Sequence, residues 1–371
     1  MKNNLFAILG IQTREDCISN ALAYAINTSK SFREQFLKQV CGKDISKYIS
    51  VNAHTRISAG ASGIPDIVVI LENQSNADIV LIENKLKAEE GIDQTIRYSS
   101  RKAVDGLMNH FKLKKTLGES SFVFLTLFPD QYPTSKEYSV HRHSELQDVM
   151  LKIYQWDNEL VKQLITDWVA LVKSFYERES ISLSDIFYDM LKDDSGLDGG
   201  FLYFRRALSK LSLPNSLQRE EFYRASRHGR RYYGARISKA SWHPSEITEI
   251  DGTWSLDALT NFNIHIEPQY NVLSREFNCF LHYEVNPYKP EQWVKANVPA
   301  CQYNEYLDRR DKFVSNLQIQ SLSGWSFGGG SNQIAKLTFD FSKSTYAEVK
   351  TVLEQEIGRM AEVIDTVLGQ I

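Results

Sequence analysis

Two apolar runs, DIVVILE at residues 66–72 and DIVLIEN at 78–84, carry charged residues at their ends. Both runs are rich in Val and Ile, which favour β-strands, and a short polar stretch joins them. Opposite residues of an antiparallel pair have a constant index sum, so a turn centred in the NQSN stretch pairs Asp66 with Glu83. Their Cβ atoms are then expected to lie about 5 Å apart.

Lys85 follows Glu83 by two residues, so the strand period places both side chains on the same face. Two carboxylates and one ammonium group therefore meet at one edge of the predicted hairpin. Carboxylates this close repel unless a cation lies between them, and their oxygens suit Mg²⁺ or Mn²⁺. Such a cation can polarise a phosphodiester and lower the pKa of a bound water. The lysine can orient that water, take its proton if its own pKa is depressed, or offset phosphate charge.

The elements that must position these residues alternate between helices and strands. Thr13 with Asp16 resembles a capping box that begins the first helix. The predicted elements are a helix from Thr13 to about Asn27, a helix at 31–40, strands near 49–57, 66–72 and 78–84, a helix at 88–113, a strand at 121–128 and a helical pattern that ends near Tyr176. This order indicates an α/β core with helices packed against a sheet.

The length of 371 residues predicts two domains. The stretch DDSGLDGG at 193–200 is the best linker candidate, which gives predicted domains at 1–192 and 201–371. The second domain changes to short runs, aromatic residues and turns before a closing amphipathic helix near 344–368, so we expect an α+β fold there. A Gly-rich connection within 319–341 lacks GxxxxGK[ST], which excludes an NTP-binding loop of that type.

Composition excludes several classes of protein. The net charge is −3 and the pI is near 6.3, so no global basic field favours nucleic acid. Four cysteines lie far apart without a CxxC pair, which fits a reducing compartment. The first residues lack a signal-peptide cleavage site and a membrane-spanning run. We therefore expect a cytoplasmic protein without a membrane partner.

Pro65–Asp66 and Glu83–Asn84–Lys85 resemble the two half-motifs of the PD-(D/E)xK nuclease superfamily. Gln94 and Tyr98, in the stretch QTIRY, lie four apart on one helix face and resemble the QxxxY motif of its exonuclease-like branch. The resemblance covers about residues 10–130. Within it, the sequence pattern RED…ALAYAIN…IENK…DQTIRY is similar to that of a bacterial subfamily linked to defence or restriction. It implies a restriction-endonuclease-like mixed sheet flanked by helices.

The resemblance also implies which residues bind the metal. Asp66 and Glu83 are expected to bind Mg²⁺ or Mn²⁺ through their carboxylates, with the Asn84 carbonyl as another ligand. Glu15 lies where many members have an additional acidic residue, and it is expected to reach the metal through water or to help bind a second ion. The alternative for Glu15 is an ordinary first-turn acid favoured by the helix dipole.

Three further residues receive catalytic roles from the resemblance. Lys85 is expected to position or activate the attacking water, and Gln94 to orient Lys85 or the nucleophile. Tyr98 supports the helix or contacts a phosphate, with core packing as the alternative. His141 and His143 have no cysteine or carboxylate at ligand spacing and are assigned no role.

Residues 201–240 contain ten basic residues against two acidic ones. Within them, FYRASRHGRRYYGAR mixes arginine, which can pair with phosphate, and tyrosine, which can stack on exposed bases. The alternative is a solvated or protein-binding surface. The predicted nucleic-acid contacts are Arg224, Arg227, Arg230, Arg231, Tyr232 and Arg236.

The sequence thus predicts a Mg²⁺- or Mn²⁺-dependent nuclease that hydrolyses DNA phosphodiesters, and the resemblance implies a role in restriction or antiphage defence. Two alternatives stay open. The same core could act on RNA such as tRNA, or the protein could be a nucleic-acid-binding or regulatory module without turnover. The oligomeric state stays open, although the resemblance allows a homodimer, since restriction-like nucleases often dimerise to cut both strands. A regulatory partner or activating ligand stays open as well.

Overall fold

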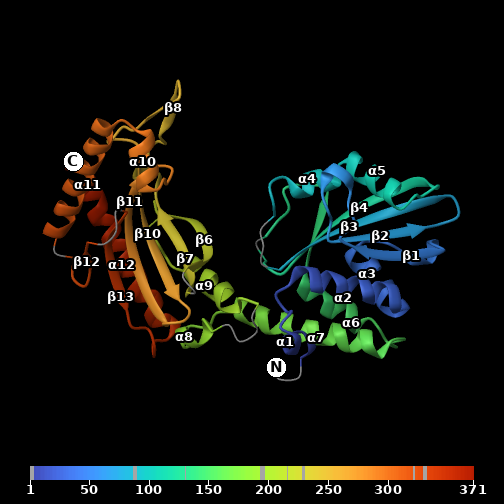
Figure 1. Ribbon diagram of the computed structural model, residues 1–371. Helices are drawn as coiled ribbons and strands as arrows, with labels where there is room; N and C mark the ends of the chain where they lie inside the picture. The colour runs from blue at the N-terminus through green and yellow to red at the C-terminus, as the bar shows by residue number, and fades with distance from the viewer. Residues whose placement is uncertain are drawn as a thin grey trace. The chain divides into compact units, whose positions relative to one another are not determined.

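A computed structural model describes residues 4–371 apart from 87–89, 130, 193–196, 215, 228–229, 321 and 329–331. The described residues form two compact units, each with its own core (Figure 1). The first unit comprises Met1–Glu177 and Asp193–Gly199, and the second comprises Arg178–Lys192 and Gly200–Ile371. In the part of the chain that the structure describes, no helix is long and apolar enough to cross a membrane.

The first unit is built on a five-stranded sheet in the order β1-β2-β3-β4-β5. β1 (Ser50–Thr55), β2 (Ile67–Glu72) and β3 (Asn76–Lys85) pair in antiparallel fashion. β4 (Thr116–Thr126) and β5 (Tyr138–Arg142) continue the sheet in parallel. The mixed sheet that the resemblance implied is therefore confirmed.

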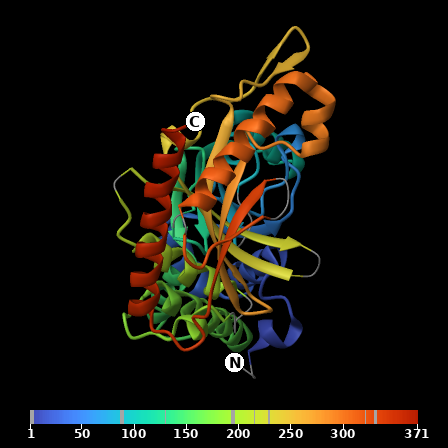
Figure 2. The same ribbon diagram turned by 90° about the vertical axis from the view of Figure 1, so that its left-hand side faces the viewer.

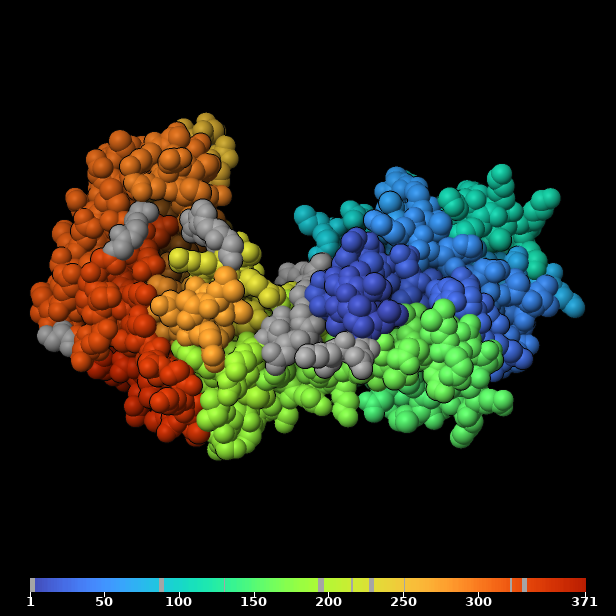
Figure 3. Space-filling model, turned by 60° about the horizontal axis from the view of Figure 1, so that its bottom comes forward, coloured from blue at the N-terminus to red at the C-terminus, as the bar shows by residue number. Residues whose placement is uncertain are grey.

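Helices cover both faces of this sheet (Figure 1). They are α1 (Leu5–Leu9), α2 (Glu15–Thr28), α3 (Lys30–Val40), α4 (Gln94–Ser99), α5 (Arg101–His110), α6 (Leu146–Leu151) and α7 (Glu159–Tyr176). α4 and α5 lie over one face, where Val68 and Leu81 pack with Leu107 of α5. α2, α3 and α6 lie over the other face. The dark blue α1 lies against the green α7 (Figure 3), where Phe6 meets Trp168 edge to face.

The structure corrects three details of these elements. α2 has Arg14 as its N-cap with no side-chain cap bond, so the predicted capping box from Thr13 is wrong; the Asp16 carboxylate binds Arg14 instead. The helix predicted at 88–113 is two helices, because Ser100 has extended backbone and caps α5. β4 begins at Thr116, before the predicted strand at 121–128.

The second unit is built on a six-stranded antiparallel sheet in the order β12-β13-β11-β10-β7-β6. Its strands are β6 (Gln218–Arg227), β7 (Arg230–Ser238), β10 (Phe262–Asn271), β11 (Glu276–Val285), β12 (Ser326–Phe327) and β13 (Gln333–Phe339). β8 (Thr248–Ile250) and β9 (Thr253–Ser255) form a separate ribbon. The helices are α8 (Phe187–Met190), α9 (Gly199–Ser209), α10 (Glu291–Asn297), α11 (Ala300–Ile319) and α12 (Tyr346–Leu368).

One face of this second sheet is apolar and carries the helices. Phe277 packs with Phe204 of α9, and Tyr283 packs with Phe313 of α11. α11 and α12 lie in front of the strands in Figure 2. α12 begins with a capping box from Thr345 and confirms the closing helix that the sequence predicted. The mixture of helices with an antiparallel sheet agrees with the predicted α+β class.

Candidate active site

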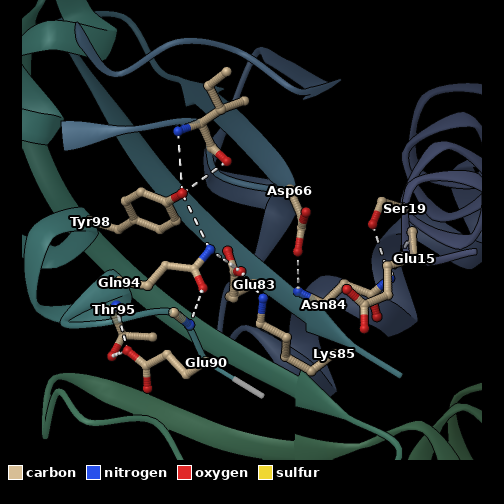
Figure 4. Close-up of polar contacts among 12 residues, drawn as sticks. Glu15, Ser19, Asp66, Glu83, Asn84, Lys85, Glu90, Gln94, Thr95 and Tyr98 are labelled. Carbon is tan, nitrogen blue, oxygen red and sulfur yellow. Dashed lines mark hydrogen bonds and ion pairs between the residues drawn. The ribbon is translucent and has the colours of Figure 1, made fainter. Parts of the chain in front are cut away.

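The register of the first sheet brings the charged strand ends together. Ile67 pairs with Ile82 across β2 and β3, so Asp66 and Glu83 are the next residues along the ladder. This is the register that the sequence predicted. Glu83 and Lys85 extend from one face of β3 toward the side chain of Asp66 (Figure 4).

The charged groups form a connected network. Lys85 Nζ lies 2.7 Å from Oε1 of Glu83, and Gln94 Nε2 donates to the same oxygen at 2.7 Å. Oδ2 of Asp66 accepts a hydrogen bond of 2.8 Å from the backbone N–H of Asn84. Glu83 is 1% exposed and Lys85 6%, so most of this network is shielded from water. Interactions between its charges are therefore strong.

Burial and repulsion raise the pKa values of both acids. Burial, and next the charge of Asp66, raises the pKa of Glu83 to about 8 despite the ion pair with Lys85. Burial also raises the pKa of Asp66, although the hydrogen bond from Asn84 opposes it. For Lys85, burial is the largest single effect and lowers the pKa, but the charge and hydrogen bond of Glu83, together with the charges of Asp66 and Glu15, outweigh it, so the net shift is upward. Lys85 is therefore a protonated donor at neutral pH, and it lacks the depressed pKa that proton abstraction requires.

Oε2 of Glu83 is the unsatisfied atom of the site. It is buried, and none of the described residues forms a hydrogen bond with it. A buried carboxylate oxygen without a partner is destabilising, whereas hard divalent cations bind such oxygens well. A cation would also offset the repulsion between Asp66 and Glu83. The residues present therefore fit a divalent metal ion such as Mg²⁺ or Mn²⁺.

Glu15 lies at the first position of α2 and reaches the end of β3. Its Oε1 accepts a hydrogen bond of 2.8 Å from the backbone N–H of Leu86. Its charge contributes to the raised pKa values of Asp66 and Glu83, so it acts on both acids. The structure thus brings Glu15 to the same strand end as the two acids.

A buried polar chain behind β3 was missed by sequence reasoning. The Asn84 side chain donates to Ser19 Oγ at 2.9 Å, and its Oδ1 lies 2.8 Å from Nε2 of His143. Trp168 Nε1–H donates to Nδ1 of His143 at 3.1 Å, so the imidazole proton is on Nε2 and is donated to Asn84. Burial lowers the pKa of His143 to about 3, which keeps the ring neutral. His143 and its partners are far apart along the chain, so no local pattern signals the contact.

α4 connects Glu83 to the turn that precedes β2 (Figure 4). Gln94 donates to Tyr98 Oη at 3.3 Å as well as to Glu83. Tyr98 Oη accepts from the N–H of Ile64 at 3.2 Å and donates to its carbonyl at 3.1 Å. The tyrosine ring lies so close to Gly63 that an added Cβ would be 2.7 Å from a ring carbon. Gln94 and Tyr98 thus form a positioning layer behind the carboxylates.

The acidic residues that follow Lys85 do not reach the carboxylate network in the described part of the chain. Glu90 accepts hydrogen bonds of 2.6 Å from the backbone of Thr95 and 2.6 Å from that of Thr134. Asp93 is the N-cap residue of α4. Glu89 lies outside the described residues. Glu90 therefore stabilises the start of α4, as an acid near a helix N-terminus does.

The predicted nucleic-acid contacts are divided between the two faces of the β6–β7 hairpin. Arg224 pairs with Tyr233, and Arg231 lies two residues before that tyrosine, so the three side chains share one face. This is the face that packs against α9, where the Arg224 guanidinium lies 5.2 Å from the centre of the Phe201 ring. Arg224 is thus engaged within the second unit.

Three of the other predicted contacts lie on the opposite face. Arg230, Tyr232 and Arg236 alternate along β7, and Arg236 Nη2 lies 3.9 Å from Oε1 of Glu284. Arg227 pairs with Arg230 in the ladder, and its side chain is not among those described. The described side chains therefore form no single basic stripe, and their contact with nucleic acid stays a prediction.

The fold and this site define a class: a nuclease core of the restriction-endonuclease-like type. Residues 3–177 match the family model of the PD-(D/E)XK nuclease superfamily, so this part of the chain belongs to that superfamily. No curated protein and no solved structure matches the chain. The superfamily implies a nucleic-acid substrate, and its members generally use divalent metal ions. The exonuclease-like branch and the defence subfamily stay predictions.

Proposed function

We propose that the protein hydrolyses DNA phosphodiester bonds with Mg²⁺ or Mn²⁺ bound by Asp66 and Glu83. The proposal rests mainly on the state of Glu83 Oε2. This oxygen is buried and has no hydrogen-bond partner among the described residues. When bound, the cation supplies Lewis acidity to a phosphoryl oxygen and lowers the pKa of a water. The Asn84 carbonyl and, through water, Glu15 complete the proposed ligand set.

The protein's own groups orient the reactants. Lys85 is protonated, so it donates a hydrogen bond to the attacking water or offsets the charge of the scissile phosphate. Gln94 and Lys85 both hold Oε1 of Glu83, which leaves Oε2 for the cation. Tyr98 holds the backbone of Ile64, and so positions the turn that leads to Asp66. Such preorganisation favours a nuclease over a module that only binds nucleic acid.

A role in restriction or antiphage defence is the narrower proposal. It is supported by the resemblance of RED…ALAYAIN…IENK…DQTIRY to a defence-linked subfamily. The basic residues of β6 and β7 would supply part of the contact with the DNA backbone, since arginine pairs well with phosphate.

The test is a cleavage assay with supercoiled plasmid, linear duplex, single-stranded DNA and total RNA, each with Mg²⁺, Mn²⁺ or EDTA. Asp66→Asn, Glu83→Gln and Lys85→Ala are each expected to slow metal-dependent DNA cleavage by about 100-fold or more. Glu72→Gln, at the far end of β2, is the matched control and is expected to cleave normally.

Cleavage that persists in EDTA, or full activity of all three variants, would overturn the assignment. Cleavage of RNA alone would keep the site and replace DNA with RNA as the substrate. Circular dichroism of each variant shows whether a loss of cleavage reflects a loss of fold.

A further inference from the structure

Two histidines and one glutamate converge on the second sheet, which carries no residue of the proposed nuclease site. His265 of β10 lies directly opposite His282 of β11 in the antiparallel register. Glu267 follows His265 by two residues, so the strand period places it on the same face. Two adjacent strands thus present three metal-ligating side chains at one place.

The two imidazole nitrogens lie beyond hydrogen-bond distance of the glutamate oxygen that they face. Nε2 of His265 and Nε2 of His282 each lie 3.7 Å from Oε2 of Glu267. The two imidazole rings are parallel within 2°, with their centres 4.8 Å apart. Donors about 2.1 Å from a tetrahedral zinc ion lie about 3.4 Å from one another. Small rotations of the side chains would therefore bring the three atoms to the spacing of a metal site.

The other oxygen of Glu267 is held in place. Oε1 accepts hydrogen bonds from Tyr223 Oη and, at 3.1 Å, from Gln269 Nε2. Gln269 also donates to Tyr223 Oη at 3.2 Å. Gly234 makes room for the tyrosine, because an added Cβ there would overlap its ring. These bonds turn Oε2 toward the two imidazoles, as outer-shell partners do for metal-binding carboxylates.

A buried nitrogen of His265 also indicates a missing ligand. His265 is 1% exposed, and its Nδ1 has no hydrogen-bond partner among the described residues. Nδ1 lies 3.9 Å from Oε1 of Glu284, an oxygen that also has no hydrogen-bond partner in the described part of the chain and whose nearest cation is Arg236 Nη2, at 3.9 Å. Coordination through Nε2 would place the ring proton on Nδ1, where the Glu284 carboxylate can accept it. Metal-binding histidines commonly have this carboxylate partner.

We propose that His265, Glu267 and His282 bind one Zn²⁺ ion. Two imidazoles and one carboxylate are a donor set that suits zinc, and the fourth position is left to water. The ion would join β10 to β11 and occupy the gap between the three ligand atoms. The site is independent of the proposed nuclease chemistry, since it shares no residue with Asp66, Glu83 or Lys85.

Zinc binding is tested on the 371-residue chain, stripped with a chelator and then titrated with Zn²⁺ against a chromophoric competitor. Wild type is expected to bind one equivalent that His282→Gln and Glu267→Gln lose. Two variants serve as controls and are expected to keep it. Glu83→Gln removes the proposed nuclease ligand, and His243→Gln removes a histidine of the second unit outside the cluster. Because no nucleic acid is present, the result does not depend on cleavage.

A smaller substitution tests zinc binding with less disturbance of the fold. Tyr223→Phe removes only the hydroxyl that holds Glu267 and is expected to weaken zinc binding by about 10-fold. The visible absorption of Co²⁺ in place of Zn²⁺ reports whether imidazole coordinates the ion. Wild type that binds no stoichiometric zinc, or an affinity unchanged in both His282→Gln and Tyr223→Phe, would overturn the proposal.

Discussion

Glu83 is a buried carboxyl group that the proposed chemistry requires in its charged form. Its pKa is raised from 4.5 to about 8, first by burial and then by Asp66. Without a divalent cation, the site therefore retains a proton at neutral pH. A cation has to displace that proton, so we expect metal binding to strengthen as the pH rises toward 8.

The same shift predicts how stability depends on pH in the absence of metal. The folded pKa of Glu83 lies above the ordinary value, so its contribution is full below pH 4.5 and is lost as the pH rises through about 8. Glu83→Gln stays uncharged and is expected to lose less stability over this range. Urea unfolding in EDTA from about pH 5 to about pH 9 measures the difference. Identical pH profiles for the two proteins would contradict the prediction.

Replacing His143 is expected to lower the free energy of unfolding more than replacing His141, two residues before it. His143→Phe leaves Oδ1 of the Asn84 side chain and Trp168 Nε1 without their partner, at a cost of about 1–3 kcal/mol for each buried group. His141→Phe removes a partly exposed contact with Glu145 and is expected to cost less than about 1 kcal/mol. Chemical denaturation measures the free energy of unfolding of both variants. Equal losses would show that the buried hydrogen bonds of His143 do not stabilise the fold.

At the scale of elements, the turn before β2 depends on one glycine. Gly63 has φ of 118°, and its missing Cβ leaves room for the ring of Tyr98. Gly63→Ala is expected to destabilise the protein by about 1–3 kcal/mol and to slow cleavage, because Tyr98 is displaced from Ile64. Unfolding and cleavage are measured on the same preparation.

Gly60→Ala is the matched control for that substitution. Gly60 also has positive φ, 68°, but an added Cβ there would meet nothing within 4 Å. It adds backbone strain without the clash and is expected to leave cleavage unchanged. If both variants slowed cleavage equally, the contact with Tyr98 would not be the cause.

Local rules explain which elements and site residues could be predicted from the sequence. The register that pairs Asp66 with Glu83 follows from two apolar runs and the turn between them, and Lys85 follows from strand alternation. The same alternation places the adjacent residues Arg230 and Arg231 on opposite faces of the hairpin. A prediction that treats the stretch as one basic patch does not take this division into account. The contacts of His143 with Asn84 span 59 positions and need the packed helices before they exist.

At the scale of the whole molecule, the two proposed metal sites belong to separate compact units. Mn²⁺ is expected to slow hydrogen exchange in β2 and β3, and Zn²⁺ in β10 and β11. A ligand at 100 times its Kd stabilises the folded state by about 2.7 kcal/mol, which mass spectrometry of exchange can resolve. Glu83→Gln should remove only the first effect and His282→Gln only the second. Protection of both sets of strands by a single metal would contradict this independence.

The two units are interleaved along the chain: Arg178–Lys192 belongs to the second unit, and Asp193–Gly199 belongs to the first. The coding sequence of either unit is therefore discontinuous. A recombination event at one breakpoint would transfer a nuclease core without part of its own chain, or with a piece of its neighbour's. The two halves of this gene are consequently expected to be inherited together, and a hybrid with another nuclease should be joined on either side of residues 178–199 rather than within them.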